Sequence, residues 1–199
     1  MGKARRMARP EATLTGKKIL ARDWGTLSRY ELTVPHSGGG AQALVREVYD
    51  HGSAAAVLLL DCRCRVMTLV RQFRLPAQLN GDAGWMLEVC AGLLDGDDPE
   101  TSAHKEALEE TGIAPHRLDF AFALYASPGS LTEKVSCFLG FYGAADRQGP
   151  GGGIGHEGED IEIVAVGFDD ALDLIASGAI IDAKTVALIQ HAALRGHLG

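Results

Sequence analysis

The sequence predicts an α/β fold, in which helices cover both faces of a mixed sheet and a small antiparallel sheet comes first. Segments typical of strands occur both before and after one central helix. Two more helices are predicted near the C-terminal end, and they give the sheet a second covering layer. With 199 residues, 46% of them hydrophobic, the chain can bury a full core in one domain of ordinary size.

The N-terminal part is predicted to contain a tail and three strands. We expect residues 1–12 to be a disordered tail, 13–50 a β segment and 51–199 the main domain. The tail is basic but lacks the apolar core of a signal peptide. Strands are predicted at 17–22, 28–34 and 43–49, with a turn or flexible loop at 37–40. Because a small sheet with free edges cannot bury itself, this segment needs a partner surface.

The main domain begins with two apolar runs, at residues 53–60 and 65–73, which are typical of buried strands. A strand at 85–90 follows, with Glu88 on one face. After the central helix we expect strands at 118–126, 134–142 and 161–168, and helices at 169–178 and 182–194. The glycine-rich segment 149–155 is predicted to be a mobile lid. It is not a phosphate loop, because no Gly-Lys-Ser/Thr follows it.

The central helix carries the chemistry. Asp98 and Pro99 mark its start, and Gly112 marks its end. Glu106, Glu109 and Glu110 stand at i, i+3 and i+4, which places three carboxylates on one face. Like charges at this spacing repel each other, unless a hard cation such as Mg²⁺, which prefers oxygen ligands, lies among them. The alternative interpretation is a solvated acidic face. The glycine-rich turn before the helix favours the metal site.

Composition narrows the choice of partners. The net charge of −7 and the isoelectric point near 5.5 argue against nucleic-acid binding by a basic surface. No apolar run reaches the length of a membrane span. The four cysteines match no zinc spacing, so we expect reduced thiols in a cytoplasmic protein.

The stretch from Ala91 to Ile113 resembles the Nudix box, Gly-x5-Glu-x7-Arg-Glu-U-x-Glu-Glu-x-Gly-U, where U is apolar. Its second half is matched from Lys105 to Ile113. There are two departures. Lys105 stands in place of the arginine, and the spacing from Gly92 is one residue short, so that Asp97 or Asp98 replaces the early glutamate. Because the helical carboxylates are intact, we interpret the box as one with a variant loop.

Further motifs resemble the branch of this family that contains the GDP-mannose and ADP-ribose pyrophosphatases. They are Arg46–Asp50, Arg71–Arg74, Cys90–Asp95, Ser127–Gly129 with Thr132 and Glu133, Gly151–Gly153 with Glu159–Glu162, and Lys184–Val186. The resemblance implies a Nudix α/β/α sandwich and a homodimer in which the N-terminal sheet is exchanged between subunits. It also implies Mg-dependent hydrolysis of a nucleoside diphosphate sugar, with GDP-mannose giving GMP and mannose 1-phosphate. ADP-ribose hydrolysis and a non-catalytic nucleotide-sensing module remain the alternatives.

The resemblance also implies roles for individual residues. Mg²⁺, with Mn²⁺ as a substitute, would be held by the Ala91 carbonyl, Glu106 and Glu110, with Glu109 as a further ligand or support. Glu159 would reach the metal and activate water, with Glu157 as its competitor. The implied substrate contacts are Trp24, Arg46, Glu47, Arg74, Gly92, Glu133 and Lys184. For Trp24 the alternative is a packing role, and for Lys184 it is a solvent-exposed side chain.

Overall fold

The computed structural model describes residues 11–153 and 160–198, which fall into two compact units. The first unit contains residues 11–51 together with Ser127–Glu133. The second contains residues 52–126 and the chain from Lys134 onward. The two units are described separately.

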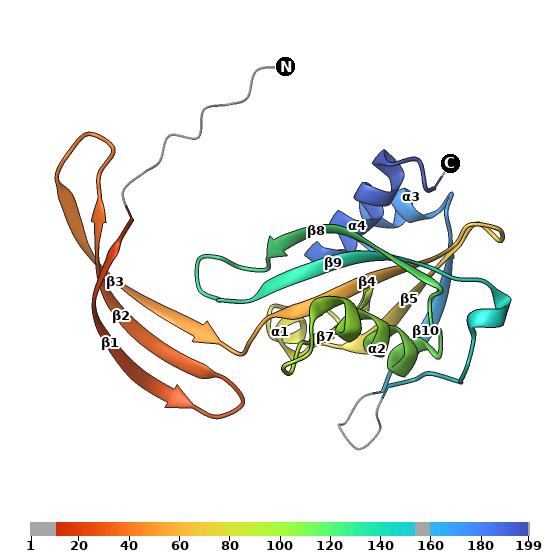
Figure 1. Ribbon diagram of the computed structural model, residues 1–199, viewed down its shortest axis with the longest axis horizontal. Helices are drawn as coiled ribbons and strands as arrows, with labels where there is room; N and C mark the ends of the chain where they lie inside the picture. The colour runs from red at the N-terminus through yellow and green to blue at the C-terminus, as the bar shows by residue number, and fades with distance from the viewer. Residues whose placement is uncertain (1–10, 154–159, 199) are drawn as a thin grey trace. The chain divides into compact units, whose positions relative to one another are not determined.

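The first unit is an antiparallel sheet of three strands in the order β1-β2-β3 (Figure 1). The strands are β1 (Thr13–Arg22), β2 (Thr26–Pro35) and β3 (Ala41–Asp50). This confirms the predicted small sheet, with longer strands than expected. The segment Ser127–Glu133 is attached to the end of β3, where the Tyr49 amide donates to the Ser130 carbonyl at 2.8 Å. The sequence gives no local sign of this attachment.

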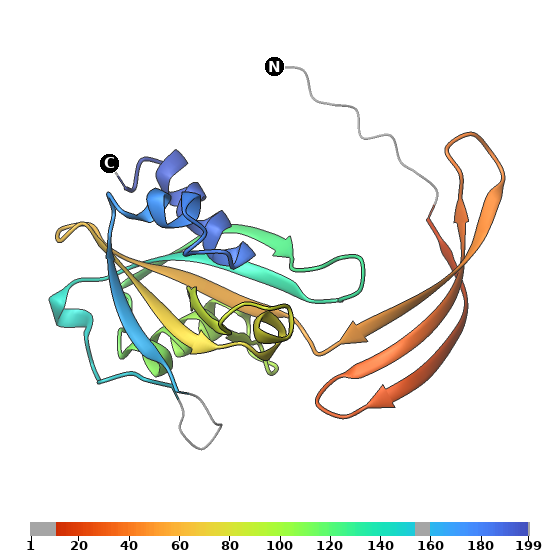
Figure 2. The same cartoon turned by 180° about the vertical axis from the view of Figure 1, so that it is seen from behind.

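The second unit contains a mixed sheet of seven strands. They are β4 (Ala54–Asp61), β5 (Val66–Phe73), β6 (Trp85–Glu88), β7 (Cys90–Leu93), β8 (Arg117–Tyr125), β9 (Lys134–Phe141) and β10 (Glu162–Gly167). The order is β10-β5-β4-β9-β8, with β6 paired to β5 and β7 to β4. The β4–β9 pair is parallel and the other pairs are antiparallel. Figure 2 shows β10 beside β5 at one edge.

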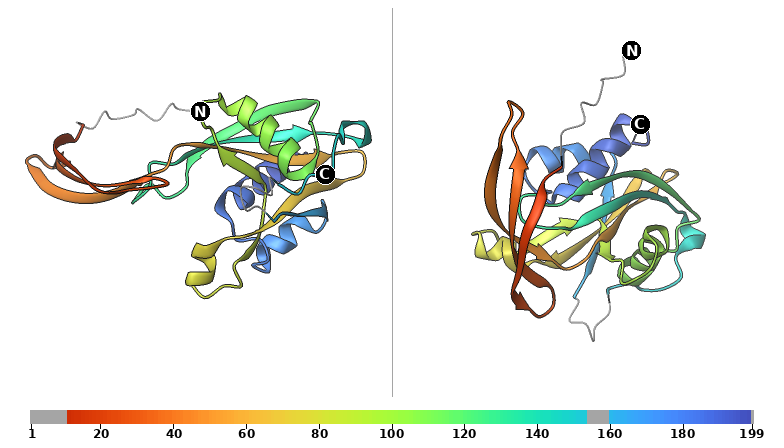
Figure 3. Two further views of the ribbon diagram at one scale, coloured as in Figure 1. Left: turned by 90° about the horizontal axis from the view of Figure 1, so that it is seen from below. Right: turned by 60° about the vertical axis from the view of Figure 1, so that its left-hand side comes forward.

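Helices cover both faces of this sheet, as Figure 3 shows from below. They are α1 (Leu75–Leu79), α2 (Pro99–Thr111), α3 (Ala171–Ala176) and α4 (Ala183–Leu194), and a 3-10 turn η1 lies at Ala144–Asp146. Strand β4 is buried along its whole length, and its side chains alternate between two cores. Leu58 packs in the core that includes Leu188 of α4, whereas Val57 packs in the core that includes Ala103 of α2.

The predicted α/β/α arrangement is confirmed, with local differences. The strand expected at 85–90 is divided at Val89, because β6 pairs with β5 whereas β7 pairs with β4. Helix α1 was not predicted, since five residues are too few to show a helical period. In the part of the chain that the structure describes, no helix is long and apolar enough to span a membrane.

Candidate active site

Helix α2 is fixed at both ends by local interactions. The Asp98 carboxylate accepts hydrogen bonds from the amides of Glu100 and Thr101, both at 3.1 Å. Gly112 ends the helix in the left-handed conformation, with φ of 70°, and its amide donates to the Leu108 carbonyl at 2.8 Å. Both predicted ends are therefore confirmed.

The carboxylate of Glu106 lies directly against strand β7. A Cβ atom added to Gly92 would overlap this carboxylate, so glycine is needed for the close approach. Gly92 and its neighbour Ala91 are in β7, where they pair with Ala55 and Ala56 of β4. The structure thus brings together Glu106 and the strand that carries the Ala91 carbonyl.

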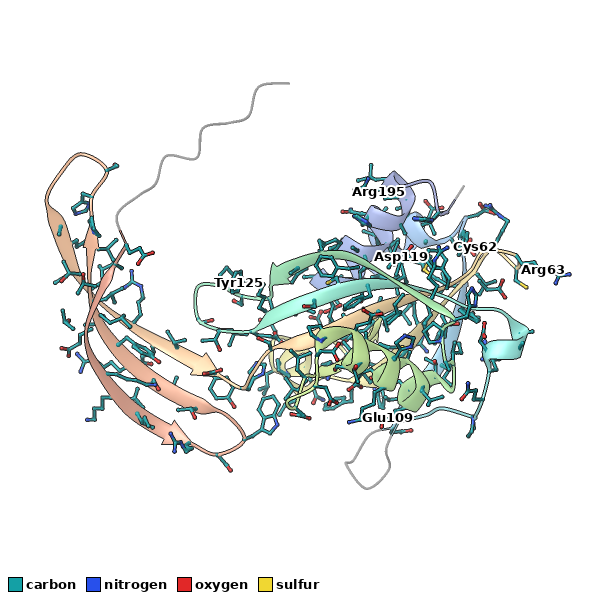
Figure 4. The ribbon with its side chains drawn as sticks, viewed as in Figure 1. Cys62, Arg63, Glu109, Asp119, Tyr125 and Arg195 are labelled. Atoms are coloured by element: carbon teal, nitrogen blue, oxygen red, sulfur yellow. The ribbon has the colours of Figure 1, made fainter. Side chains whose placement is uncertain are left out.

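Glu110 lies one turn further along α2 and is 2% exposed. Burial raises the pKa of the adjacent Cys90 thiol well above its ordinary value, and the charge of Glu110, its hydrogen bond and the charge of Glu106 add to this effect. Both carboxylates therefore act on the same buried strand residue. Glu109 is half-buried on α2, where Figure 4 labels it.

The oxygen ligands at this place fit a hard divalent cation. Two carboxylates and a backbone carbonyl are all oxygen ligands, which Mg²⁺ prefers. The missing side chain at Gly92 lets the Glu106 carboxylate lie against β7, beside the residue that carries the Ala91 carbonyl. Among residues 11–153 and 160–198, no group of three or more acidic, histidine or cysteine side chains is arranged to hold a metal. The predicted further acid, Glu159, and its competitor Glu157 lie outside the described residues.

The first residues of the glycine-rich segment are bound to the end of α2. The amides of Gln148, Gly152 and Gly153 donate to the carbonyls of Gly112, Glu110 and Glu109, at 2.7, 2.9 and 3.2 Å. Gly151 has φ of 64°, and a Cβ atom there would overlap the Thr111 backbone. Residues 149–153 belong to the segment 149–155 that we expect to be a mobile lid, and they satisfy the last carbonyls of the helix, which have no partners within it. The rest of that segment lies outside the described residues.

A second cluster of charges surrounds Glu88, at the end of β6. Arg74 Nε and Nη2 donate to its two carboxylate oxygens, both at 2.9 Å. Lys184 Nζ donates to Glu88 Oε2 at 2.8 Å and to Asp182 Oδ1 at 3.0 Å. Asp182 also caps α4, where it accepts from the Thr185 amide at 2.9 Å. The predicted substrate contacts Arg74 and Lys184 are thus held by two acids that the sequence did not single out for this role.

Electrostatics link this cluster to α2. Burial acts to raise the pKa of Glu88, but Arg74 and Lys184 outweigh it and hold the pKa below its ordinary value. Burial acts to lower the pKa of Arg74, but Glu88 raises it, and the charges of Glu110 and Asp182 add to this. Arg74 is therefore within electrostatic range of Glu110 on α2.

The remaining predicted substrate contacts lie in the first unit. Trp24 is 71% exposed and stacks on His51, with ring centroids 4.9 Å apart. Arg46 and Glu47 are exposed on β3, and Arg46 Nη1 donates to the Val45 carbonyl at 2.8 Å. Glu133 is half-buried in the segment attached to β3.

A cavity of about 750 Å³ lies elsewhere in the second unit. It is lined by the β4–β5 turn, where Figure 4 labels Cys62 and Arg63, and by residues near the ends of β8 and β9, such as Arg117 and Phe141. None of its lining residues belongs to α2, β7 or the Glu88 cluster. The cavity is therefore separate from the candidate site.

Comparison with known proteins places the chain in a family. Residues 50–189 match the NUDIX domain. The chain is 41% identical over 181 residues to a GDP-mannose pyrophosphatase of Pectobacterium atrosepticum, covering 90% of this chain and 93% of that protein. It is 42% identical over 180 residues to the corresponding enzyme of Cronobacter sakazakii, with the same coverage. Its fold is similar to a crystal structure of an ADP compounds hydrolase, with a TM-score of 0.73, 19% identity, and coverage of 95% of this chain and 97% of the other. The chain belongs to the Nudix family, and the helix that brings Glu106 and Glu110 to β7 carries its box.

Proposed function

We propose that the protein hydrolyses the pyrophosphate bond of a nucleoside diphosphate sugar, and that GDP-mannose is its substrate, giving GMP and mannose 1-phosphate. The observation that carries this proposal is the placement of Glu106 and Glu110 against β7. The Nudix relatives that match about 90% of the chain are named GDP-mannose pyrophosphatases. ADP-ribose is the second candidate substrate, since the similar fold belongs to an ADP compounds hydrolase.

Glu106, Glu110 and the Ala91 carbonyl would hold Mg²⁺, with Mn²⁺ as a substitute and Glu109 in support. When bound, the metal neutralises phosphoryl oxygens and lowers the pKa of a coordinated water. We assign to Glu159 the orientation and deprotonation of the attacking water, with Glu157 as the alternative. Residues 149–153 are attached to α2, and both glutamates follow Gly153 within six positions in the sequence, which supports this assignment.

The protein groups around the substrate would act by positioning and by charge. Arg74 and Lys184 would donate hydrogen bonds to the diphosphate, for which arginine has a suitable planar fork. Gly92, against which Glu106 lies, would contact the substrate through its backbone. From the first unit, Trp24 would stack on the base, and Arg46, Glu47 and Glu133 would contact the nucleotide sugar. We place this activity in the cytoplasm.

We further propose a homodimer formed through the β1–β3 sheet. Leu14 and Ile19 of that sheet are exposed apolar side chains, which supports a covering partner. Light scattering of the full chain should give about twice the monomer mass of 21.1 kDa. A monomer at micromolar concentration would contradict this part of the proposal.

The proposal is tested by hydrolysis assays with Mg²⁺. We would compare kcat/KM for GDP-mannose, other GDP- and UDP-sugars, and ADP-ribose, and identify the products. A preference for GDP-mannose supports the proposal, whereas a preference for ADP-ribose supports the second candidate. Nucleotide binding without turnover of any of these compounds would favour a non-catalytic sensing module.

The metal assignment is tested by Glu110→Gln, which removes a ligand charge with little change in shape. We expect a loss of about a hundredfold or more in kcat. Glu100→Gln is the matched control, because Glu100 is exposed in the first turn of the same helix. Near-normal turnover of Glu110→Gln at saturating Mg²⁺ would show that the metal site is assigned wrongly. Glu159→Gln, compared with Glu157→Gln, decides which acid activates water.

A further inference from the structure

Three charged hydrogen bonds meet on Glu88, although its side chain is only 2% exposed. Arg74 reaches it from just beyond the end of β5, and Lys184 reaches it from the first turn of α4, 96 residues away in the sequence. A carboxylate buried in this way is costly unless it is paired. Here two cations pair with it. The N–H donors that these cations do not use for Glu88 indicate the role of the arrangement.

Within residues 11–153 and 160–198, both cations keep N–H donors that no hydrogen bond uses. Arginine has five N–H donors in one plane, and the two-point contact with Glu88 uses Nε and one hydrogen of Nη2. The two hydrogens of Nη1 and the second of Nη2 remain, and these form a fork that suits a phosphoryl group. Lys184 uses two of its three N–H groups, on Glu88 and Asp182. The Arg74 side chain is 39% exposed and the Lys184 side chain is 17% exposed.

Charge balance explains why the two cations can lie close together. Arg74 and Lys184 would repel at this separation, since both contact the same Glu88 oxygen. Glu88 and Asp182 supply two negative charges, so the four side chains together are neutral. The contact also fixes the guanidinium plane, because a single hydrogen bond would leave Arg74 free to rotate.

We propose that Glu88 is a positioning residue, which holds Arg74 and Lys184 side by side so that their remaining N–H donors grip the diphosphate of the substrate. This inference rests on the proposed function for the identity of the anion. The carboxylate of Glu88 is turned to the two cations, so its proposed action is through them. The alternative is that Glu88 only neutralises charge for folding.

A double-mutant cycle separates these roles. We would measure kcat and KM for GDP-mannose with Glu88→Gln, Arg74→Ala and the double variant. Each single change should lower kcat/KM by about tenfold to a hundredfold. If Glu88 acts through Arg74, the double variant should lose less than the product of the single losses, by about tenfold. Losses that multiply, or a Glu88→Gln variant with unchanged kcat/KM, would overturn the proposal.

A binding assay makes the test independent of turnover. Calorimetric titration with inorganic pyrophosphate, without metal, should show binding to the wild type and about tenfold weaker binding to Glu88→Gln. If the wild type fails to hydrolyse GDP-mannose, the proposed function fails while this titration still decides the role of Glu88. Equal pyrophosphate affinity in both proteins, or no binding by the wild type, would overturn the inference.

Two further variants complete the design. Arg74→Lys keeps the charge but loses the two-point contact, and it serves if Glu88→Gln fails to fold. It should also bind pyrophosphate about tenfold more weakly, and wild-type affinity would refute the need for a fixed guanidinium. Asp169→Asn is the matched control, because it neutralises the acid of an exposed pair with Arg65, at 2.8 Å. It should leave pyrophosphate affinity and kcat/KM unchanged.

Discussion

Replacing Gly92 by alanine is the most direct test of the geometry between α2 and β7. The added Cβ would overlap the Glu106 carboxylate, while the backbone of Gly92 is in an extended strand that alanine can adopt. The substitution therefore adds one methyl group and forces Glu106 to move. None of the side chains that we assign to the metal is replaced.

The expected effects on stability and activity differ in size. Overpacking by a methyl group costs about 1–3 kcal/mol in a closed core. Glu106 is half-buried and can turn toward solvent, so we expect about 1 kcal/mol, or a fall in Tm of about 2–4 °C for a chain of this length. A ligand displaced by about 1 Å costs about a hundredfold in rate, equivalent to about 2.7 kcal/mol of transition-state stabilisation.

The assay measures kcat, the Mg²⁺ concentration at half-maximal activity, and Tm. We expect Gly92→Ala to lower kcat, raise the Mg²⁺ requirement and retain a cooperative thermal transition. Gly143→Ala is the control, because an added Cβ at Gly143 meets nothing within 4 Å. If Gly92→Ala keeps the kcat and the Mg²⁺ requirement of the wild type, Glu106 does not bind metal from its position over β7.

Three other predictions concern stability. Asp182→Ala removes both the cap of α4 and a charged partner of Lys184, and should lower the free energy of unfolding by more than the ~1 kcal/mol of a cap alone, whereas Asp182→Asn keeps a capping oxygen and should lower it less, as chemical denaturation can show. Gly151→Ala should destabilise the end of α2, because its Cβ would overlap Thr111; faster amide exchange at the Gly152 amide would report it, and unchanged exchange would count against it. The pKa of Glu88 is lowered in the folded state, so the contribution of its charge to the free energy of unfolding is complete above pH 4.5, near the ordinary pKa of a glutamate. This contribution is lost as the pH falls through the lowered pKa. Glu88→Gln should therefore reduce the loss of stability in acid.

The features that sequence reasoning predicted correctly depend on local signals. Asp98 and Gly112 limit α2 through contacts within three or four residues, and each residue type favours its position for its own steric or hydrogen-bonding reason. The apolar run at 53–60 predicted a buried strand, and β4 is buried because α2 and α4 cover its two faces. The i, i+3, i+4 spacing placed the glutamates on one face for the same local reason.

The features that were missed depend on distant pairings. Val89 divides a continuous strand pattern because the residues before it pair with β5 and the residues after it pair with β4. Likewise, Ser127–Glu133 reads as a turn, and its attachment to Tyr49 requires a partner about 80 residues earlier. The hydrogen bonds from Gly152 and Gly153 to the end of α2 also join segments that are about 40 residues apart in the sequence.

Glu88 shows why a functional cluster can escape a motif search. Strand alternation places its side chain on one face, but burial would normally exclude a carboxylate from that face. The carboxylate is stable there because Arg74 and Lys184 arrive from segments 14 and 96 residues away. Each cation, taken alone, resembles a substrate contact or a solvated side chain, and only their common partner shows that they form one unit. The functional unit is therefore the buried acid together with its two cations, and a change to Glu88 should affect both.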